Sequence, residues 1–235
     1  MTREAVIVTG ASGALGGALV RILARENALV VAIGRGVDQK ELDRELGAGR
    51  ALATAFDVTV RDEWKKLEAR LESEGTTPVG AVLAAGGWKG GKKLHEETDD
   101  GTWRAMLDAN LETARASLQG LLPGMVERRR GSIVVVGSRA SVRPWESAKA
   151  AAYAASKAAV VALVGVVAEE VRPQSVRVNS ILPSTIDSPQ NRAAMPSADP
   201  SRWVTVDSIA DVVKFLLSDA ARDVSGAAIP VYGNA

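Results

Sequence analysis

The sequence predicts one α/β domain over residues 1–235, with a doubly wound, seven-stranded and mostly parallel sheet between two helical layers. Short apolar, β-branched runs alternate with longer segments of helical periodicity along the whole chain. No linker rich in Pro, Gly and Ser divides the 235 residues, which is an ordinary length for one domain. Residues with unusual chemistry follow the ends of the apolar runs. Because ligands bind beyond the carboxyl ends of the strands in such sheets, a site is expected along one edge.

The apolar runs give the strands, and the segments between them give the helices. Strands are predicted at 5–9, 28–33, 51–56, 79–84, 132–136, 176–182 and 227–231. Helices are predicted at 18–25, 38–46, 61–74, 98–130, 148–171 and 206–217. In the fourth helix Thr98 is expected to cap the start, and Pro123 with Gly124 to disturb the later turns. Residues 184–204 are expected to form a long loop, which in a compact domain is usually a lid or disordered.

The helix predicted over 148–171 is small and apolar on every side, above all from Ala158 to Val167. A helix without a polar face is expected to be buried all round. In a domain of this size such burial indicates a subunit interface, so a homodimer or homotetramer is expected. No other charge-free apolar run reaches the length of about 18 residues that a membrane span needs, and no membrane partner is expected.

The composition argues against several other classes of function. Net charge is +1, with both signs spread along the chain, which gives no reason to expect a nucleic-acid or membrane partner. The chain has no cysteine, and so no disulfide or thiol chemistry. Its one histidine, His95, has no carboxylate cluster to help it hold a metal, so no metal site is expected. The N-terminus leads straight into a strand without a charged and then apolar leader, so the cytoplasm is the expected compartment.

A glycine-rich turn, with glycines at 10, 13 and 16, follows the first predicted strand and opens the helix after it. Backbone N–H groups of such a turn, together with the N-terminus of the helix, can bind a pyrophosphate. Gly16 would let the helix approach the strand closely. A glycine pattern between a strand and a helix is the context that turns it into a prediction of dinucleotide binding.

The end of the second predicted strand indicates which dinucleotide is bound. An acidic residue there would bond the adenosine ribose and repel a 2′-phosphate, but this chain has Gly34 followed by Arg35. An Arg can bind a 2′-phosphate, so NADP(H) is predicted over NAD(H). The alternative is that Arg35 is only a surface charge. Asp57 and Val58, at the end of the third strand, are predicted to contact the adenine amine; a helix cap is the alternative for Asp57.

Tyr153 and Lys157 stand four residues apart in a predicted helix, which puts them on one face and one turn from each other. A free phenol titrates near pH ~10, and an ammonium beside it stabilises the phenolate. A shift of about three units would bring the phenol near neutral and let it exchange a proton with an alcohol or carbonyl. Chance spacing on a helix is the alternative, and the surrounding motifs argue against it.

These motifs together resemble the short-chain dehydrogenase/reductase family over essentially the whole chain, which implies a Rossmann-type domain. The similar stretches are 9–16, Asp57-Val58, Asn110 within 107–111, 131–138, Tyr153 with Lys157, 177–183 and Ser225-Gly226. The resemblance implies that Tyr153 is the acid/base, and that Lys157 lowers its pKa and holds the nicotinamide ribose. It implies that Ser138 steadies the substrate oxygen and that Asn110 holds a water in a proton relay. The cofactor-binding residues implied are Gly10, Ser12, Gly13, Leu15, Gly16, Arg35, Asp57, Val58, Ala84, Ala85, Gly86, Tyr153, Lys157, Pro183, Ile186 and Ser188.

The chain departs from the family pattern in ways that bear on the site. The middle glycine is Gly13, where the family more often has it one residue later, and no asparagine accompanies the glycine after the fourth strand. Ser138 stands fifteen residues before Tyr153, about two more than usual, so Ser141 is a competing candidate for the active serine. Pro183 is followed by Ser184 where a glycine is typical.

Two stretches, 84–91 and 182–203, are similar to the corresponding parts of dihydropteridine reductases. Those enzymes use NADH, have an acid after the second strand and lack the serine, whereas this chain has Arg35 and Ser138. The predicted function is therefore an NADP(H)-dependent oxidoreductase acting on a small carbonyl or alcohol. A C=N reductase of the dihydropteridine type and a non-catalytic dinucleotide-binding regulator are the alternatives. Three tryptophans are expected either to line the substrate pocket or to pack locally: Trp88, Trp145 and Trp203.

Overall fold

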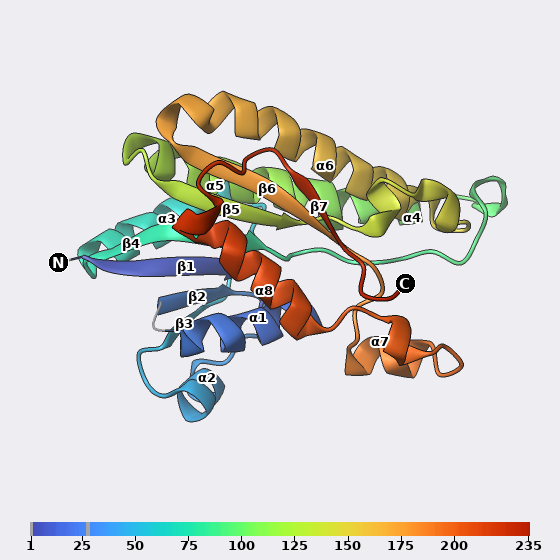
Figure 1. Cartoon of the computed structure of the whole chain (residues 1–235), viewed down its shortest axis with the longest axis horizontal. Helices are drawn as coiled ribbons and strands as arrows, with labels where there is room; N and C mark the ends of the chain where they lie inside the picture. The colour runs from blue at the N-terminus through green and yellow to red at the C-terminus, as the bar shows by residue number, and fades with distance from the viewer. Residues whose placement is uncertain (1, 27–28) are drawn as a thin grey trace.

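The computed structural model describes residues 2–26 and 29–235 and contains one seven-stranded sheet (Figure 1). The strand order is β3-β2-β1-β4-β5-β6-β7, and every pairing between neighbours is parallel. The doubly wound α/β fold predicted from the sequence is thus confirmed, with a fully parallel sheet. The start of the second predicted strand, Ala28, lies outside the described residues. The strands are β1 (Arg3–Thr9), β2 (Leu29–Ile33), β3 (Ala51–Thr54), β4 (Thr76–Leu83), β5 (Gly131–Val136), β6 (Val176–Pro183) and β7 (Ala228–Val231).

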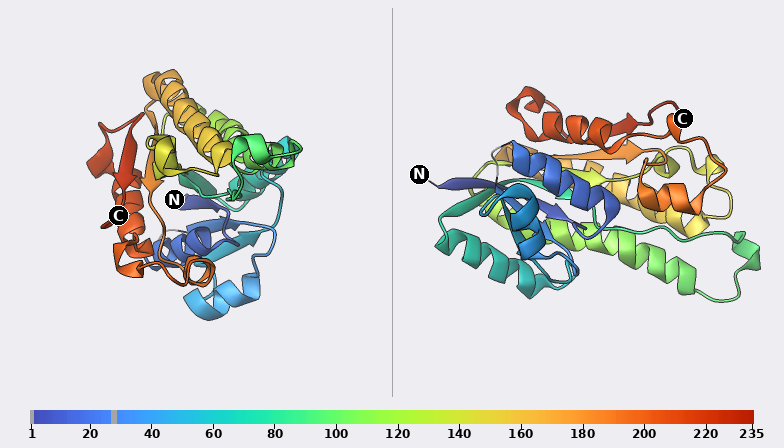
Figure 2. Two further views of the ribbon diagram at one scale, coloured as in Figure 1. Left: turned by 90° about the vertical axis from the view of Figure 1, so that its right-hand side faces the viewer. Right: turned by 90° about the horizontal axis from the view of Figure 1, so that it is seen from below.

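Helices cover both faces of this sheet, as Figure 2 shows from two further sides. One layer holds α3, α5 and α6, and the other holds α1, α8 and the short α2. The helices are α1 (Ala14–Arg25), α2 (Gln39–Leu46), α3 (Arg61–Ser73), α4 (Gly101–Met106), α5 (Thr113–Glu127), α6 (Ala151–Val171), α7 (Pro189–Ala194) and α8 (Val206–Leu217).

The strands are apolar throughout because each side chain meets one of the two helical layers. In β1, Ala5 and Ile7 belong to the core under α3, α5 and α6, while Val6 and Val8 belong to the core under α1 and α8. Alternation of side chains across a strand that is covered on both faces gives a continuous apolar run. This arrangement leaves the ends of the strands as the place for polar chemistry.

The segment predicted as one helix over 98–130 is divided by a π-helical stretch, Leu107–Glu112, between α4 and α5. The expected cap at Thr98 is wrong, because α4 begins at Gly101, whose N–H donates to the Asp99 carboxylate at 2.6 Å. The expected disturbance at Pro123 is also wrong, because α5 continues through it to Glu127. The interruption lies earlier, where an extra residue per turn is accommodated.

Helix α6 is not buried all round within one chain, as its composition had suggested. Its packed face includes Val160 and Val164, but Ala158 and Ala162 are exposed and Val166 is 59% exposed. The span 151–174 is long and apolar enough to cross a membrane by length and composition, and 44% of that window is buried. Because the packed face lies on the sheet in one of the two core layers, α6 has the position of a core helix. Its exposed stripe is where a subunit interface remains predicted.

The long segment 184–204 is a folded loop with its two ends joined. It contains α7 and a 3-10 turn at Pro200–Arg202, and Ile186 and Val204 form a parallel bridge at its base. Two backbone bonds reinforce the bridge, from Asp187 N to Val204 O at 2.8 Å and from Val204 N to Thr185 O at 3.0 Å. In Figure 1 the segment and the C-terminus lie at the same end of the molecule, at the carboxyl ends of the strands.

Candidate active site

The predicted site residues lie along one edge of the sheet. Gly10 follows β1, Arg35 lies beyond β2, Ala84 follows β4 and Ser138 lies beyond β5. Pro183 ends β6. Since all neighbouring strands run parallel, these ends face the same side, and the expected gathering of the candidates at one edge is confirmed.

The glycine turn is built by backbone contact that leaves no room for a side chain. Gly10 has φ +69°, and a Cβ there would lie 2.6 Å from the backbone of Ala84 and Ala85. A Cβ on Gly16 would lie 2.2 Å from the carbonyl oxygen of Gly10. Helix α1 starts at Ala14 after Gly13, which provides no side-chain cap. The first-turn N–H groups of α1 are therefore free of a protein cap, in a cradle that fits a pyrophosphate.

Beside the turn, Ser12 is in close contact with the residues that follow β2. The Oγ of Ser12 accepts a hydrogen bond from Gly36 N at 3.0 Å. A Cβ on Gly34 would lie only 2.4 Å from that same Oγ. The Arg35 side chain between these two glycines is exposed. The Ser12 hydroxyl and the Arg35 guanidinium thus border the end of β2 next to the glycine turn. Asp38 and Glu41 line the same pocket as Ser12 further along.

Asp57 lies beyond β3 and holds a tight turn. Its carboxylate accepts hydrogen bonds from the N–H of Thr59 at 3.0 Å and from the Thr59 hydroxyl at 2.8 Å. These bonds lower the pKa of Asp57, and the positive charge of Arg35 lowers it further. Val60 precedes α3, so Asp57 is not its N-cap. Val58 is buried, and its carbonyl accepts a hydrogen bond from the Trp64 indole at 2.8 Å.

The segment after β4 closes against Asn110 and Lys157. The N–H of Ala85 donates to the Thr9 hydroxyl at 3.2 Å. A Cβ on Gly86 would lie 2.8 Å from Asn110 Oδ1 and 3.4 Å from Lys157 Nζ. Glycine is therefore the residue that fits where this segment passes over the two side chains.

Asn110 is buried in the π-helical stretch and joins two elements. Its Oδ1 accepts a hydrogen bond from Gly87 N at 3.0 Å, and its Nδ2 donates to Ser156 Oγ at 3.0 Å. The widened turn places the amide between the segment after β4 and helix α6. Single π-helical turns are frequent at functional sites, and this one positions a predicted site residue.

Lys157 is buried, and its ammonium has a fixed partner. Its Nζ donates to the carbonyl oxygen of Val136 at 2.8 Å, at the end of β5. Burial lowers the pKa of Lys157 to about 8. The side chain thus lies under the site, beside Gly86, with its charge held in a desolvated position.

Tyr153 behaves differently from the expectation drawn from its spacing to Lys157. Burial raises the pKa of the Tyr153 phenol, and a hydrogen-bonding interaction with Ser138 acts in the opposite direction. The expected lowering by Lys157 is not found in this structure, where desolvation dominates and the ammonium is directed to Val136. A phenol in this state keeps its proton at neutral pH.

Of the two competing serines, Ser138 is the one that interacts with Tyr153. Ser138 is buried, and its Oγ also accepts a hydrogen bond from Ala140 N at 3.2 Å. The hydroxyl of Ser141 is buried and has no hydrogen-bond partner. The structure therefore brings together Tyr153, Ser138, Lys157 and Asn110, and places Ser141 outside this set of contacts.

The segment after β6 provides the remaining predicted residues. Pro183 and Ser188 are buried, and Ser188 Oγ accepts from Asn191 N at 3.2 Å as the cap of α7. The carbonyl oxygen of Ile186 accepts from Asn191 Nδ2 at 2.8 Å. These two residues are thus engaged in holding the start of α7.

The three tryptophans do not form one pocket wall. Trp203 is 8% exposed and packs inside the folded loop, whereas Trp88 and Trp145 are 67% and 74% exposed. Of the two interpretations open for these rings, local packing fits Trp203 and also Trp88, whose ring lies against Gly90, while Trp145 is largely exposed.

The sequence reasoning missed a cluster of Arg139, Arg143, Glu146 and Tyr232 next to Ser138. The guanidinium carbons of Arg139 and Arg143 lie 5.8 and 5.3 Å from the centre of the Tyr232 ring. Both arginines also pair with the Glu146 carboxylate, at 3.2 and 3.4 Å. The signal in the sequence was two basic residues shortly after the candidate serine. Nothing local pointed to the C-terminal tyrosine.

The comparisons with known proteins agree with this geometry. A family profile described as short chain dehydrogenase matches residues 4–198. Nodulation protein G of Rhizobium meliloti is 32% identical, with 99% of this chain and 97% of that protein covered. An uncharacterized NAD-dependent oxidoreductase of Mycobacterium tuberculosis is 32% identical, over 95% of this chain and 92% of that protein. A short-chain type dehydrogenase/reductase from Mycobacterium ulcerans has a similar structure, with TM-score 0.86, 29% identity and coverage of 99% and 89%.

The chain belongs to the short-chain dehydrogenase/reductase family. It is an oxidoreductase with a Rossmann-type fold that uses a nicotinamide dinucleotide. Among the residues that the structure describes, no three His, Cys, Asp or Glu side chains gather in a way that could hold a metal ion.

Proposed function

We propose that this protein reduces a small carbonyl compound, or oxidises the matching alcohol, with NADP(H) as its cofactor. The observation that carries the proposal is the meeting of Tyr153, Ser138 and Lys157 at the carboxyl edge of the sheet, beside the glycine turn. Burying a phenol, a hydroxyl and an ammonium together lowers the free energy of unfolding. Such a cluster is therefore a good candidate for a catalytic site.

The proton chemistry follows from the phenol. A reduced nicotinamide, when bound, supplies a hydride to the carbonyl carbon. The Tyr153 hydroxyl donates its proton to the carbonyl oxygen, so that C=O becomes CH–OH and charge is balanced. The raised pKa of Tyr153 suits a proton donor, because the phenol is protonated at neutral pH. The Ser138 hydroxyl donates a hydrogen bond to the same substrate oxygen and orients it.

Lys157 and Asn110 have supporting roles in this proton transfer. With a pKa of about 8, Lys157 keeps its proton at neutral pH and offers N–H donors to the ribose hydroxyls of the cofactor. The hydrogen bond with Ser138, which lowers the pKa of Tyr153 against the effect of burial, favours the phenolate that remains after proton donation. Asn110 fixes the segment after β4 through Gly87 N and would position a water that returns the proton to Tyr153.

The preference for NADP(H) rests on Arg35 and its neighbours. An exposed guanidinium and the Ser12 hydroxyl border the end of β2, where a carboxylate would repel a 2′-phosphate. The Mycobacterium tuberculosis relative is named as NAD-dependent, which points the other way. We favour NADP(H) because the side chains of this chain, rather than of its relatives, decide the contact.

A second candidate is reduction of a conjugated C=N bond in a dihydropterin. The stretches 84–91 and 182–203, which are similar to dihydropteridine reductases, favour it. The presence of Ser138 beside Tyr153 favours a carbonyl instead. A non-catalytic regulator would have no need to keep a buried Lys157 next to Tyr153.

The proposal is tested by oxidation of NADPH with a panel of ketones, quinones and quinonoid dihydropterin. Removal of the phenol hydroxyl in Tyr153→Phe should lower kcat about 10³-fold, within the range for loss of a general acid. Cofactor affinity in the variant should stay close to that of the wild type. Cofactor binding without turnover of any compound would support a regulator.

We also propose a homodimer or homotetramer joined through α6, and a cytoplasmic location. The exposed, uncharged stripe that includes Ala158, Ala162 and Val166 supports the interface. Val166→Glu should dissociate the assembly, and sedimentation velocity would measure it. A wild type that sediments as a monomer at assay concentration would contradict the proposal.

A further inference from the structure

The cluster next to Ser138 contains two guanidiniums and one carboxylate. Arg139 and Arg143 share Glu146, and each also lies over the Tyr232 ring. One carboxylate balances only one of the two positive charges. Both arginines are anchored by these contacts, which reduces the entropy lost when they bind a further anion. The cluster is therefore a prepared site with an excess positive charge.

The cluster joins the segment after β5 to the segments after β6 and β7. Arg139 directly follows Ser138, beyond β5. Tyr232 follows β7, and its carbonyl oxygen accepts a hydrogen bond from Ser184 Oγ, after β6, at 2.7 Å. A Cβ on Gly233 would lie 2.9 Å from the carbonyl oxygen of Trp203, so the C-terminal segment is packed against the folded loop 184–204. Because Arg139 is the next residue after Ser138, the cluster adjoins the segment that carries the Ser138 hydroxyl.

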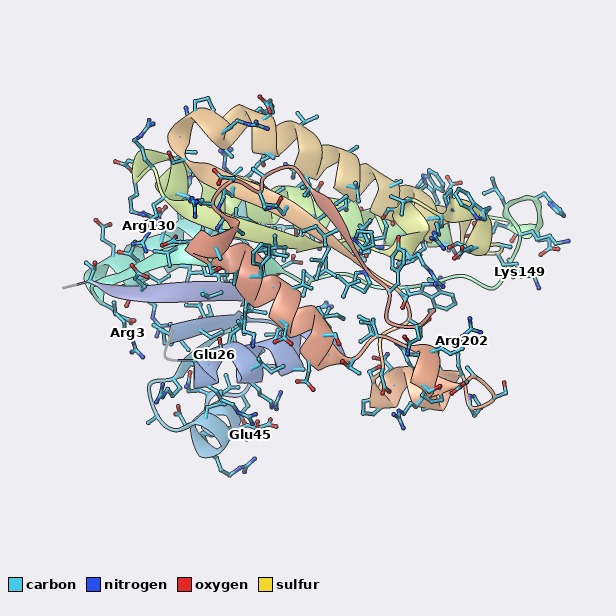
Figure 3. All side chains as sticks on the ribbon, in the orientation of Figure 1. Arg3, Glu26, Glu45, Arg130, Lys149 and Arg202 are labelled. Atoms are coloured by element: carbon cyan, nitrogen blue, oxygen red, sulfur yellow. The ribbon has the colours of Figure 1, made fainter. Side chains whose placement is uncertain are left out.

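Charges of both signs surround this end of the molecule. The segments 88–108, 139–149 and 184–204 contain nine Lys and Arg against eight Asp and Glu, so the excess positive charge is local to Arg139 and Arg143. Figure 3 shows Lys149 and Arg202 at this end, with Arg3 and Arg130 at the opposite end of the sheet.

We propose that the substrate is an oxo compound, or the matching hydroxy compound, that carries a carboxylate or phosphate held by Arg139 and Arg143. This inference rests on the proposed carbonyl chemistry at Tyr153 and adds the class of substrate. The planar guanidinium binds both groups through paired hydrogen bonds. Glu146 holds the arginines in place without the substrate and competes with it for them.

The proposal is tested with matched pairs of compounds that differ only in charge. The pairs are levulinate with methyl levulinate, for carboxylate, and dihydroxyacetone phosphate with dihydroxyacetone, for phosphate. In the wild type kcat/KM should be higher for the anionic member of one pair, and the pair that responds identifies the anion. In Arg143→Gln that preference should fall about tenfold, the cost of one charge-assisted hydrogen bond. Arg70→Gln, an equally exposed arginine paired with Glu74 on α3, is the control and should keep the preference.

A second variant separates substrate binding from a purely structural role of the cluster. In Glu146→Gln the competing carboxylate is gone, so KM for the anionic compound should fall severalfold. If the cluster only fastened the loop after Ser138, this variant would lower the melting temperature and leave the preference for the anion unchanged. That result would overturn the proposal.

The results that would overturn the anionic substrate differ from those that would overturn the proposed carbonyl chemistry. Reduction of both members of each pair with equal kcat/KM would preserve the carbonyl chemistry and overturn the anionic substrate. Reduction of no compound would count against the proposed function, and calorimetry of levulinate and dihydroxyacetone phosphate with the NADP⁺-loaded enzyme then decides the inference. Binding that Arg143→Gln weakens about tenfold supports it, and absence of binding by both anions overturns it.

Discussion

The cofactor side and the substrate side of this site are built in different ways. On the cofactor side backbone meets backbone, as where Gly10 lies against Ala84 and Gly16 against Gly10. On the substrate side long side chains from distant segments meet, as where Arg143 lies over Tyr232. The first arrangement tolerates almost no added atom, while the second can be changed by exchanging side chains. A constant cofactor can therefore be kept while the substrate changes.

The comparison predicts the largest effect for a single methyl group on the cofactor side. In Gly16→Ala the new Cβ would lie 2.2 Å from the Gly10 oxygen, so α1 must move away from the turn. Overpacking of this kind should lower the free energy of unfolding by about 1–3 kcal/mol, as urea denaturation would measure. Misplacement of the turn by about 1 Å should lower kcat/KM about 100-fold. Gly165→Ala is the control within one chain, because a Cβ there meets no atom within 4 Å, and sedimentation velocity checks that this change on the exposed stripe of α6 leaves the assembly intact. Equal losses of stability and of kcat/KM in the two variants would contradict the tight backbone packing ascribed to the cofactor side.

A smaller effect is expected where the cofactor side does use a side chain. Arg35→Ala should weaken NADPH about tenfold or more, the cost of a charge-assisted hydrogen bond to the 2′-phosphate, and should change NADH little. Fluorescence titration with both cofactors measures the two affinities. Arg35→Lys should recover part of the NADPH affinity because it keeps the charge. If both cofactors lost affinity equally, Arg35 would be a surface charge without this role.

A separate effect is expected on the pH dependence of stability, through Lys157, which lies between the two sides. Burial lowers its pKa from 10.5 to about 8, so between these values the unfolded chain binds more protons at this residue than the folded chain. The Lys157 contribution to the free energy of unfolding therefore rises with pH across this window, because its penalty is complete below about pH 8 and gone above about pH 10.5.

The variant Lys157→Met removes this contribution. The free energy of unfolding of the variant minus that of the wild type should therefore decrease as pH rises from about 8 to about 10.5. Urea denaturation of both proteins at several pH values gives this difference directly. A difference that stays constant across the window would show that Lys157 is not desolvated in the way the structure indicates.

Local features of the sequence predicted the fold and the position of the glycine turn. Strands such as β1 are continuous apolar runs, and the glycine turn depends on residues within seven positions of each other, from Gly10 to Gly16. The pairing of Tyr153 with Lys157 on one face of α6 follows from helical geometry alone. In each case the interacting residues are close in the sequence, so their pattern contains the structural information.

Features that depend on distant partners could not be predicted. The π-helical turn at Asn110 is fixed by Gly87 and Ser156, which lie far along the chain on either side. The ammonium of Lys157 is directed by the Val136 carbonyl, a backbone group without any sequence signature. The meeting of Arg143 with Tyr232 requires the whole sheet to bring the C-terminus back to β5.

The bridge between Ile186 and Val204 gives the segment between them an independence that the rest of the edge lacks. Because the chain leaves and re-enters the fold at nearly the same point, the length of the segment between these residues is not fixed by the distance from β6 to α8. Its sequence is constrained instead by buried Ser188 and Trp203 and by the packing of Gly233 against Trp203. Changes in the exposed residues of 187–203 are therefore expected to alter this end of the molecule without displacing β6 or α8.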